Sequence, residues 1–152
     1  MNSSNSGLIE IDEIKQWLPH RKPMLLIDFA SEFISGQSLV GHLSPTVDDG
    51  WFDGHFPGRP IMPGVLLVEC MAQSAALLAS KTWSISPKTH TIMFTSIDKT
   101  KFRSAVFPGD ELNIPIEIIL RKRNFIQFSG KVIANGKLAV SCVFWASSVE
   151  RK

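Results

Sequence analysis

The run of residues 64–79 most constrains what this chain can fold into, because it has the length of a helix and almost no polar face. Pro63 suits the first turn of such a helix, where its missing N–H does no harm, and the pattern continues to about Lys81. A helix that is apolar nearly all round has to be surrounded by protein. We therefore expect a buried central helix, rather than a membrane span that would hide a carboxylate in lipid. Its polar side chains are Glu69, Gln73 and Ser74.

Most of the remaining chain is typical of β-structure. Before the central helix we expect a short amphipathic helix over residues 11–18, ended by Pro19, and a structured loop rich in Gly and Pro over 48–63. Asn135-Gly136 is a strong type I′ hairpin signal. One buried helix and about six mostly antiparallel strands predict an α+β fold in which a curved sheet wraps the helix. The strands are expected over 24–34, 38–47, 91–103, 111–121, 125–134 and 138–149.

Length and composition fit a single domain over residues 9–152, preceded by a polar leader over 1–8. The leader lacks the basic and apolar segments of a secretion signal, so we expect it to be disordered and the protein to be cytoplasmic. The net charge of +2 gives no general affinity for nucleic acid or for an anionic membrane. Cys70 and Cys142 lie in apolar runs without metal-ligand spacing, and we expect both to be reduced core residues.

Two side chains in this pattern suit proton transfer. Burial on a helix favours the neutral form of Glu69, which makes it a candidate proton donor; the alternative is a glutamate paired with a buried arginine or a partner subunit. His55 lies in a loop, residues 54–60, whose backbone Gly and Pro restrict, and histidine suits proton transfer at neutral pH. A histidine in a loop is more often structural. That interpretation is given to His20, His42 and His90.

Gly64 opens the central helix, where the first N–H groups lack internal partners and carry the positive end of the dipole. They can hold a carbonyl oxygen that is becoming an enolate; the alternative is an ordinary helix start. Together, a base, an acid and an oxyanion donor match proton abstraction next to a carbonyl with loss of a β-hydroxyl. Because Glu69 lies about one and a half turns inside the helix, we expect the site to be assembled across a dimer interface.

Residues 54–73, GHFPGRPIMPGVLLVECMAQ, closely resemble the core motif of the bacterial β-hydroxyacyl-[acyl-carrier-protein] dehydratases of fatty-acid synthesis. The resemblance extends to Leu18-Pro19-His20-Arg21 and residues 26–28 near the start, and to Phe102-Arg103 and residues 106–112 later. It therefore covers nearly the whole chain in the expected order. The resemblance implies the hot-dog fold, in which a curved sheet wraps a central helix.

The same resemblance implies a role for each residue. His55 would take the C2 proton of an (R)-3-hydroxyacyl thioester, and Glu69 of the partner subunit would protonate the departing 3-hydroxyl. The N–H of Gly64 would hold the thioester carbonyl. The substrate would be carried on the phosphopantetheine of an acyl carrier protein, giving trans-2-enoyl product and water without a metal or redox cofactor. A homodimer, and in many members a trimer of dimers, would be expected; a glutamate at position 69 favours dehydration without isomerisation.

The chain departs from the family at Lys22 and Met24, where aromatic residues are usual, and it contains no tyrosine. In the family, the aromatic residue in this segment lies near the mouth of the tunnel that holds the acyl chain. The departure therefore bears on acyl-chain length and carrier docking, and points to polyketide or polyene synthesis as an alternative pathway.

Acyl carrier proteins are strongly acidic, so cations near the tunnel mouth would steer their encounter with the enzyme. Within the predicted strand 91–103, the basic residues alternate and would share a face. Residues 121–123, Arg-Lys-Arg, form a second cluster for which docking and a solvated strand end both stay open. The expected docking residues are Lys22, Arg59, Lys99, Lys101 and Arg103.

Two other functions stay open. A hot-dog acyl thioesterase also combines a helix carboxylate with a helix N-terminus, but it does not need the loop of His55. A non-catalytic helper subunit of a heteromeric dehydratase is the second alternative, and the presence of both His55 and Glu69 argues against it.

Overall fold

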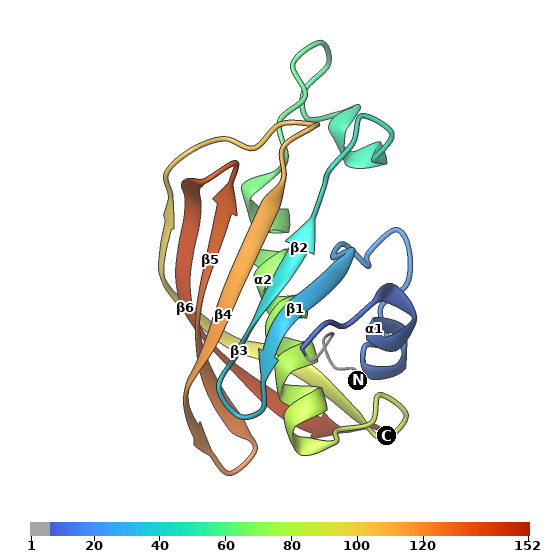
Figure 1. Ribbon diagram of the computed structural model, residues 1–152, viewed down its shortest axis with the longest axis vertical. Helices are drawn as coiled ribbons and strands as arrows, with labels where there is room; N and C mark the ends of the chain where they lie inside the picture. Colours follow the sequence, from blue (N-terminus) through green and yellow to red (C-terminus); the bar gives the residue numbers. More distant parts are fainter. Residues whose placement is uncertain (1–6) are drawn as a thin grey trace, which may run out of the picture.

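A six-stranded antiparallel sheet curls around the long helix α2 (Gly64–Trp83), and the short helix α1 (Ile11–Trp17) lies beside the N-terminal strands (Figure 1). The computed structural model describes residues 7–152. A 3₁₀ turn, η1 (Gly50–Phe52), lies between β2 and α2. The predicted α+β hot-dog architecture is confirmed. The strands are β1 (Phe29–Ile34), β2 (Ser38–Leu43), β3 (His90–Phe102), β4 (Leu112–Lys122), β5 (Phe125–Ala134) and β6 (Lys137–Glu150).

The sheet has the order β1-β2-β4-β5-β6-β3, so β1 and β3 form its two edges. β5 and β6 are joined by Asn135 and Gly136, whose φ angles of 50° and 81° are both positive, as a type I′ turn requires. Ile9 exchanges two backbone hydrogen bonds with Ala30 and so covers part of β1. Within residues 7–152, β3 is therefore the edge that stays open along its length.

The sheet encloses α2 because the helix offers apolar side chains in nearly every direction. Twelve of its 20 residues are buried, and it contacts β2, β4, β5, β6 and β3. The closest approach is to β2, where Gly41 faces Ser74 of the helix. A Cβ at position 41 would overlap the Ser74 hydroxyl, which itself donates a hydrogen bond to the Cys70 carbonyl at 2.9 Å. Glycine at this position therefore sets the distance between helix and sheet.

The membrane and cysteine predictions also agree with the structure. By length and composition alone α2 could cross a bilayer, but 67% of that stretch is buried within the domain, which makes it a core helix. Cys70 and Cys142 are free and buried. Burial raises the pKa of both thiols, most strongly that of Cys70, so they are inert core residues.

Two predicted strands are too long at the ends that flank the β1–β2 hairpin. The prediction of a strand from residue 24 is wrong for residues 24–28, because the amides of Met24 and Leu25 bond to the Arg21 carbonyl in a turn. β2 ends at Leu43 rather than residue 47, since the next amide bonds to the Asp28 carboxylate at 2.9 Å. A turn carbonyl in the first case and a side-chain carboxylate in the second replace the ladder partners that a strand would need.

Smaller corrections concern the N-terminus and the loop before α2. The Gly7 carbonyl accepts a hydrogen bond from Phe33 N, so residue 7 takes part in the fold and is not disordered; residues 1–6 of the predicted leader lie outside the described residues. The first helix ends at Trp17, one residue earlier than predicted. The loop over residues 48–63 contains one regular element, the 3₁₀ turn η1, that the sequence did not predict.

We predict that Gly41→Ala lowers the free energy of unfolding by about 1–3 kcal/mol, because the added methyl group has to push the buried Ser74 aside. Urea or thermal unfolding followed by circular dichroism measures the change. Gly50→Ala is the matched control, since a Cβ there meets no atom within 4 Å. Equal stability of both variants would contradict the tight helix–sheet contact.

Candidate active site

The loop that carries His55 is held in shape by its own backbone hydrogen bonds. Phe56 and Arg59 exchange two bonds of 2.8 Å, and Ile61 N donates to the His55 carbonyl at 2.8 Å. These bonds close the loop between η1 and α2, so the backbone at His55 is fixed before any ligand arrives. The Gly-rich and Pro-rich composition predicted this shape, and the structure supplies the bonds that enforce it.

The same loop fixes the imidazole of His55. Its Nδ1 lies 2.7 Å from the Ile61 carbonyl oxygen, which can only accept a hydrogen bond, so Nδ1 carries the proton. In the neutral ring Nε2 is then unprotonated and free to act as a base. The ring of Phe56 stacks against the imidazole, with 4.0 Å between centroids. The arrangement is that of a general base whose partner nitrogen is held by a backbone carbonyl.

His55 shares a cavity of about 430 Å³ with Gly64, the first residue of α2. No side chain caps this helix start. Its first N–H groups therefore lack side-chain partners at the end of the helix that borders the cavity. A Cβ at position 64 would come within 2.8 Å of the Phe102 ring. Phe102 of β3 packs over the helix start and leaves no room for a side chain at position 64. The absence of a side chain also leaves space for a substrate.

Glu69 lies outside that cavity. It lines a second cavity of about 300 Å³, which shares no residue with the first. Within one chain the structure thus brings His55 and Gly64 together and leaves Glu69 apart. The second cavity is lined by His20, Glu69, Ala72, Ala75, Ala76, Ile92, Met93, Phe94, Phe144 and Ala146.

The surroundings of Glu69 are also less enclosed than the sequence suggests. Its side chain is 24% exposed, and Val65, one turn earlier, is 72% exposed. With Ala72 they follow i, i+4, i+7 spacing and form one stripe along α2 that the sheet does not bury completely. The expectation of a helix buried on all sides is therefore wrong along this stripe. An apolar stripe carrying a carboxylate suits a surface that another molecule covers.

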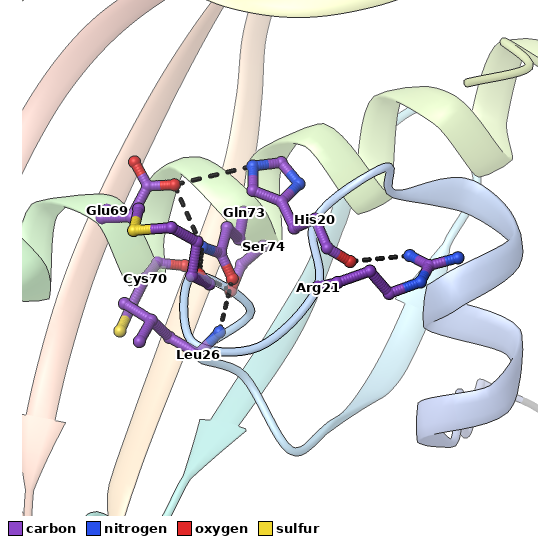
Figure 2. Close-up of polar contacts among 8 residues, drawn as sticks. His20, Arg21, Leu26, Glu69, Cys70, Gln73 and Ser74 are labelled. Atoms are coloured by element: carbon purple, nitrogen blue, oxygen red, sulfur yellow. Dashed lines mark hydrogen bonds and ion pairs between the residues drawn. The ribbon is translucent and has the colours of Figure 1, made fainter. Parts of the chain in front are cut away.

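Two residues approach one oxygen of the Glu69 carboxylate (Figure 2). Gln73 Nε2 donates to Glu69 Oε2 at 3.0 Å, and His20 Nε2 lies 3.7 Å from the same oxygen. Gln73 could have been found from the sequence, because it stands four residues after Glu69 on the same helix face. His20 was interpreted as structural. The only signal in its favour was its place in the Leu18-Pro19-His20-Arg21 motif.

The expected docking cations are all exposed, but they do not form one cluster. Arg103 lines the cavity of His55, whereas Lys22 lines a different cavity of about 550 Å³ beside Trp51. The expectation that Lys99, Lys101 and Arg103 share a face is not met. A bulge between Asp98 and Lys101 interrupts the alternation, with Lys99 in the left-handed region at φ 48°, and β3 ends before Arg103.

The second basic cluster, residues 121–123, lies around the β4–β5 turn, at the other end of the molecule from the loop of His55 (Figure 1). The Arg121 guanidinium stacks 4.3 Å above the ring of Trp83, the last residue of α2. This contact gives Arg121 a structural role at the negative end of the helix dipole.

Comparison with solved structures shows the same fold in proteins of low sequence identity. The dehydratase heterocomplex ApeI:P of Xenorhabdus doucetiae superposes with a TM-score of 0.74 at 18% identity, over 91% of each chain. A hypothetical thioesterase with coenzyme A from Streptococcus pneumoniae superposes with a TM-score of 0.61 at 11% identity, over 80% of this chain and 85% of the other. At these identities the likeness extends to the fold alone.

Sequence comparison is more specific. The 3-hydroxyacyl-[acyl-carrier-protein] dehydratase FabZ of Caulobacter vibrioides is 39% identical over 142 residues, which are 93% of this chain and 89% of the relative. The family model of the FabA-like domain matches residues 18–142, a range that contains His20, His55, Gly64, Glu69 and Gln73. The chain therefore belongs to the FabA-like family of dehydratases.

Proposed function

We propose that this protein dehydrates (3R)-3-hydroxyacyl-[acyl-carrier-protein] to the trans-2-enoyl form, in fatty-acid or related polyketide or polyene synthesis in the cytoplasm. One observation carries the proposal above all. His55, whose Nδ1 is held by the backbone, and Gly64, at the uncapped start of α2, line a common cavity. A base beside an oxyanion donor is what removal of a proton next to a thioester carbonyl requires.

The chemistry proceeds by proton transfers alone. His55 Nε2 takes the proton from C2, and the electron pair of that C–H bond moves toward the carbonyl, whose oxygen the Gly64 N–H holds. The pair then forms the C2=C3 bond as the C3–O bond breaks. Glu69, acting as the acid, gives a proton to the departing hydroxyl, so that water leaves. Return of a proton from His55 to Glu69 restores both groups.

The acid and the base in one site would come from different subunits. His55 and Glu69 of one chain line separate cavities, and the stripe of Val65, Glu69 and Ala72 on α2 is uncovered. The adjacent edge strand β3 also exposes apolar side chains, among them Met93 at 55% and Ile97 at 47%. An open edge beside an apolar stripe favours a homodimer formed along β3, which would place Glu69 of the partner subunit at His55.

The acyl carrier protein would approach at the end of the molecule that carries the loop of His55. Arg103 lines that cavity, and Arg59 lies in the exposed loop between His55 and α2. Lys99, within the bulge of β3, and Lys101, directly after it, lie toward the same end of that strand. An acidic carrier would be steered to this end by their charge, while the cluster at residues 121–123 is too distant to contribute at the mouth.

Dehydration is favoured over the two alternatives. A thioesterase has no use for the free Nε2 of His55 beside the helix start, and a helper subunit has no use for an intact pair of His55 and Glu69. Purified protein incubated with 3-hydroxyacyl and acyl carrier thioesters separates the three functions by mass spectrometry. Loss of 18 Da as water, release of free acid, and no reaction correspond to dehydratase, thioesterase and helper subunit.

We predict that His55→Ala and Glu69→Gln each lower the dehydration rate by about 100- to 10,000-fold, the usual effect of losing a general base or acid. Turnover of a 3-hydroxyacyl thioester, followed by absorbance of the enoyl product, measures the loss. Circular dichroism should show unchanged folding, since neither side chain is in the core. Near-normal turnover by either variant would show that the assigned pair is wrong.

We predict that mixing these two inactive variants restores part of the activity. In a heterodimer, one site combines the intact His55 of one chain with the intact Glu69 of the other, while the second site lacks both groups. Heterodimers isolated with two different affinity tags give the activity directly. Purified heterodimers that stay inactive would place both residues of each site in one chain.

We predict that Lys99→Glu with Lys101→Glu raises KM for carrier-bound substrate and weakens its salt dependence, but leaves a short pantetheine thioester unaffected. The control is Lys122→Glu with Arg123→Glu, which makes the same change of net charge at the opposite end. Equal losses on both substrates would mean that Lys99 and Lys101 serve the fold. Equal effects of the two double variants would mean that only the total charge matters.

A further inference from the structure

We propose that His20 is a positioning residue for Glu69: its Nε2–H and the amide of Gln73 together hold Oε2 and leave Oε1 as the oxygen that exchanges the proton. This inference rests on the proposed dehydration, to which it adds a residue. His20 belongs to the segment between α1 and β1, far from Glu69 in sequence. Figure 2 shows the imidazole and the Gln73 amide converging on the same carboxylate oxygen.

The protonation state of His20 follows from its surroundings. Burial lowers the pKa of His20, Arg21 lowers it further, and only the Glu69 carboxylate acts in the opposite direction. The imidazole is therefore mainly neutral at pH 7 and carries one proton. His90, which lines a small crevice together with His20, is the other titratable side chain on that side.

The proton of the neutral ring belongs on Nε2. His20 Nδ1 is buried and makes no hydrogen bond among the described residues. A proton on Nδ1 would leave a buried donor without an acceptor and would turn the bare Nε2 toward a carboxylate oxygen. A proton on Nε2 instead points at Glu69 Oε2, 3.7 Å away. A small rotation closes this gap to a hydrogen bond when the carboxylate gains its charge.

The segment that carries His20 cannot move far from Glu69. Gln73 is 1% exposed; its Oε1 accepts from Leu26 N at 2.9 Å and its Nε2 donates to the Met24 carbonyl at 2.6 Å. Arg21 bonds to the carbonyls of Lys15 and Leu18 on the other side. The backbone at His20 is thus held between α1 and α2, close enough for the imidazole to reach the carboxylate.

This geometry assigns different roles to the two carboxylate oxygens. Oε2 faces two N–H donors, whereas no described residue donates a hydrogen bond to Oε1. When Glu69 gives its proton to the departing hydroxyl, the negative charge that forms is stabilised at Oε2 by both donors. Since this charge is present only after proton transfer, loss of His20 should slow the chemical step more than it weakens substrate binding.

The test compares three substitutions at one position. His20→Phe keeps a ring but removes the donor, and we expect kcat to fall by about tenfold to a hundredfold, with KM nearly unchanged. His20→Gln places an amide N–H close to where Nε2 lies and should recover most of kcat. His20→Asn is the matched control, because its shorter amide reaches only the position of Nδ1 and should recover little. Unchanged kcat in His20→Phe, or a rise in KM alone, would overturn the proposal.

A double-mutant cycle separates positioning from support of the fold. In the Glu69→Gln background, where no carboxylate forms, His20→Phe should cause almost no further loss of residual rate. A further loss as large as that in the wild-type background would mean that His20 supports the structure generally. Thermal unfolding of each variant identifies any that fails to fold, and only folded variants enter the cycle.

A readout without turnover keeps this inference distinct from the proposed function. NMR of ¹⁵N-histidine-labelled protein reports the tautomer of each ring, and we expect His20 to be the Nε2–H form and to shift on Glu69→Gln, while His42 and His90 do not. An Nδ1–H tautomer, or no response to Glu69→Gln, would refute the contact. A wild-type protein without dehydratase activity but with the expected spectrum would refute the proposed function and leave the contact established.

Discussion

The structure depends on how the sheet encloses α2. A helix that is apolar in nearly every direction has to be covered, and one curved sheet covers most of its circumference. The uncovered remainder is a stripe on which Val65, Glu69 and Ala72 lie. The packing that buries the neighbouring residues of α2 therefore leaves the Glu69 carboxylate outside the hydrophobic core. Enclosure of α2 decides both where Glu69 lies and which face of the helix stays open to other molecules.

Gln73 joins this helix to the segment that precedes β1. It is buried, and the oxygen of its side-chain amide accepts from Leu26 N, while the nitrogen donates to the Met24 carbonyl and the Glu69 carboxylate. The contact with Met24 uses only the backbone, so it does not depend on the side chain at that position. This explains how the chain departs from the aromatic residue of its family at position 24 and still keeps the segment in place. The substitution therefore changes only the Met24 side chain, which is 48% exposed, and not the backbone contact.

The parts of the fold that the sequence predicted are those specified by local chemistry or strong periodicity. The apolar run predicted α2, and Asn135-Gly136 predicted the hairpin that the structure confirms. The errors arise where distant groups decide the outcome. Residues 24–28 look like a strand, yet the amides of Met24 and Leu25 bond to a turn and that of Leu26 bonds to Gln73. The bulge in β3 depends on register with β6, which the alternation of Lys99 and Lys101 does not reveal.

The candidate site shows the same division. His55 could be identified from the sequence because the Gly and Pro residues around it predict a loop of restricted shape. Glu69 could be identified because a carboxylate is rare on an apolar helix. His20 has no comparable local signal, since its partner is 49 residues away in the sequence. In the proposed assembly, His55 is held by the backbone of one chain and Glu69 by the side chains of the other. Each group is thus positioned by contacts within its own chain, so the proposed dimer would bring together two preorganised halves.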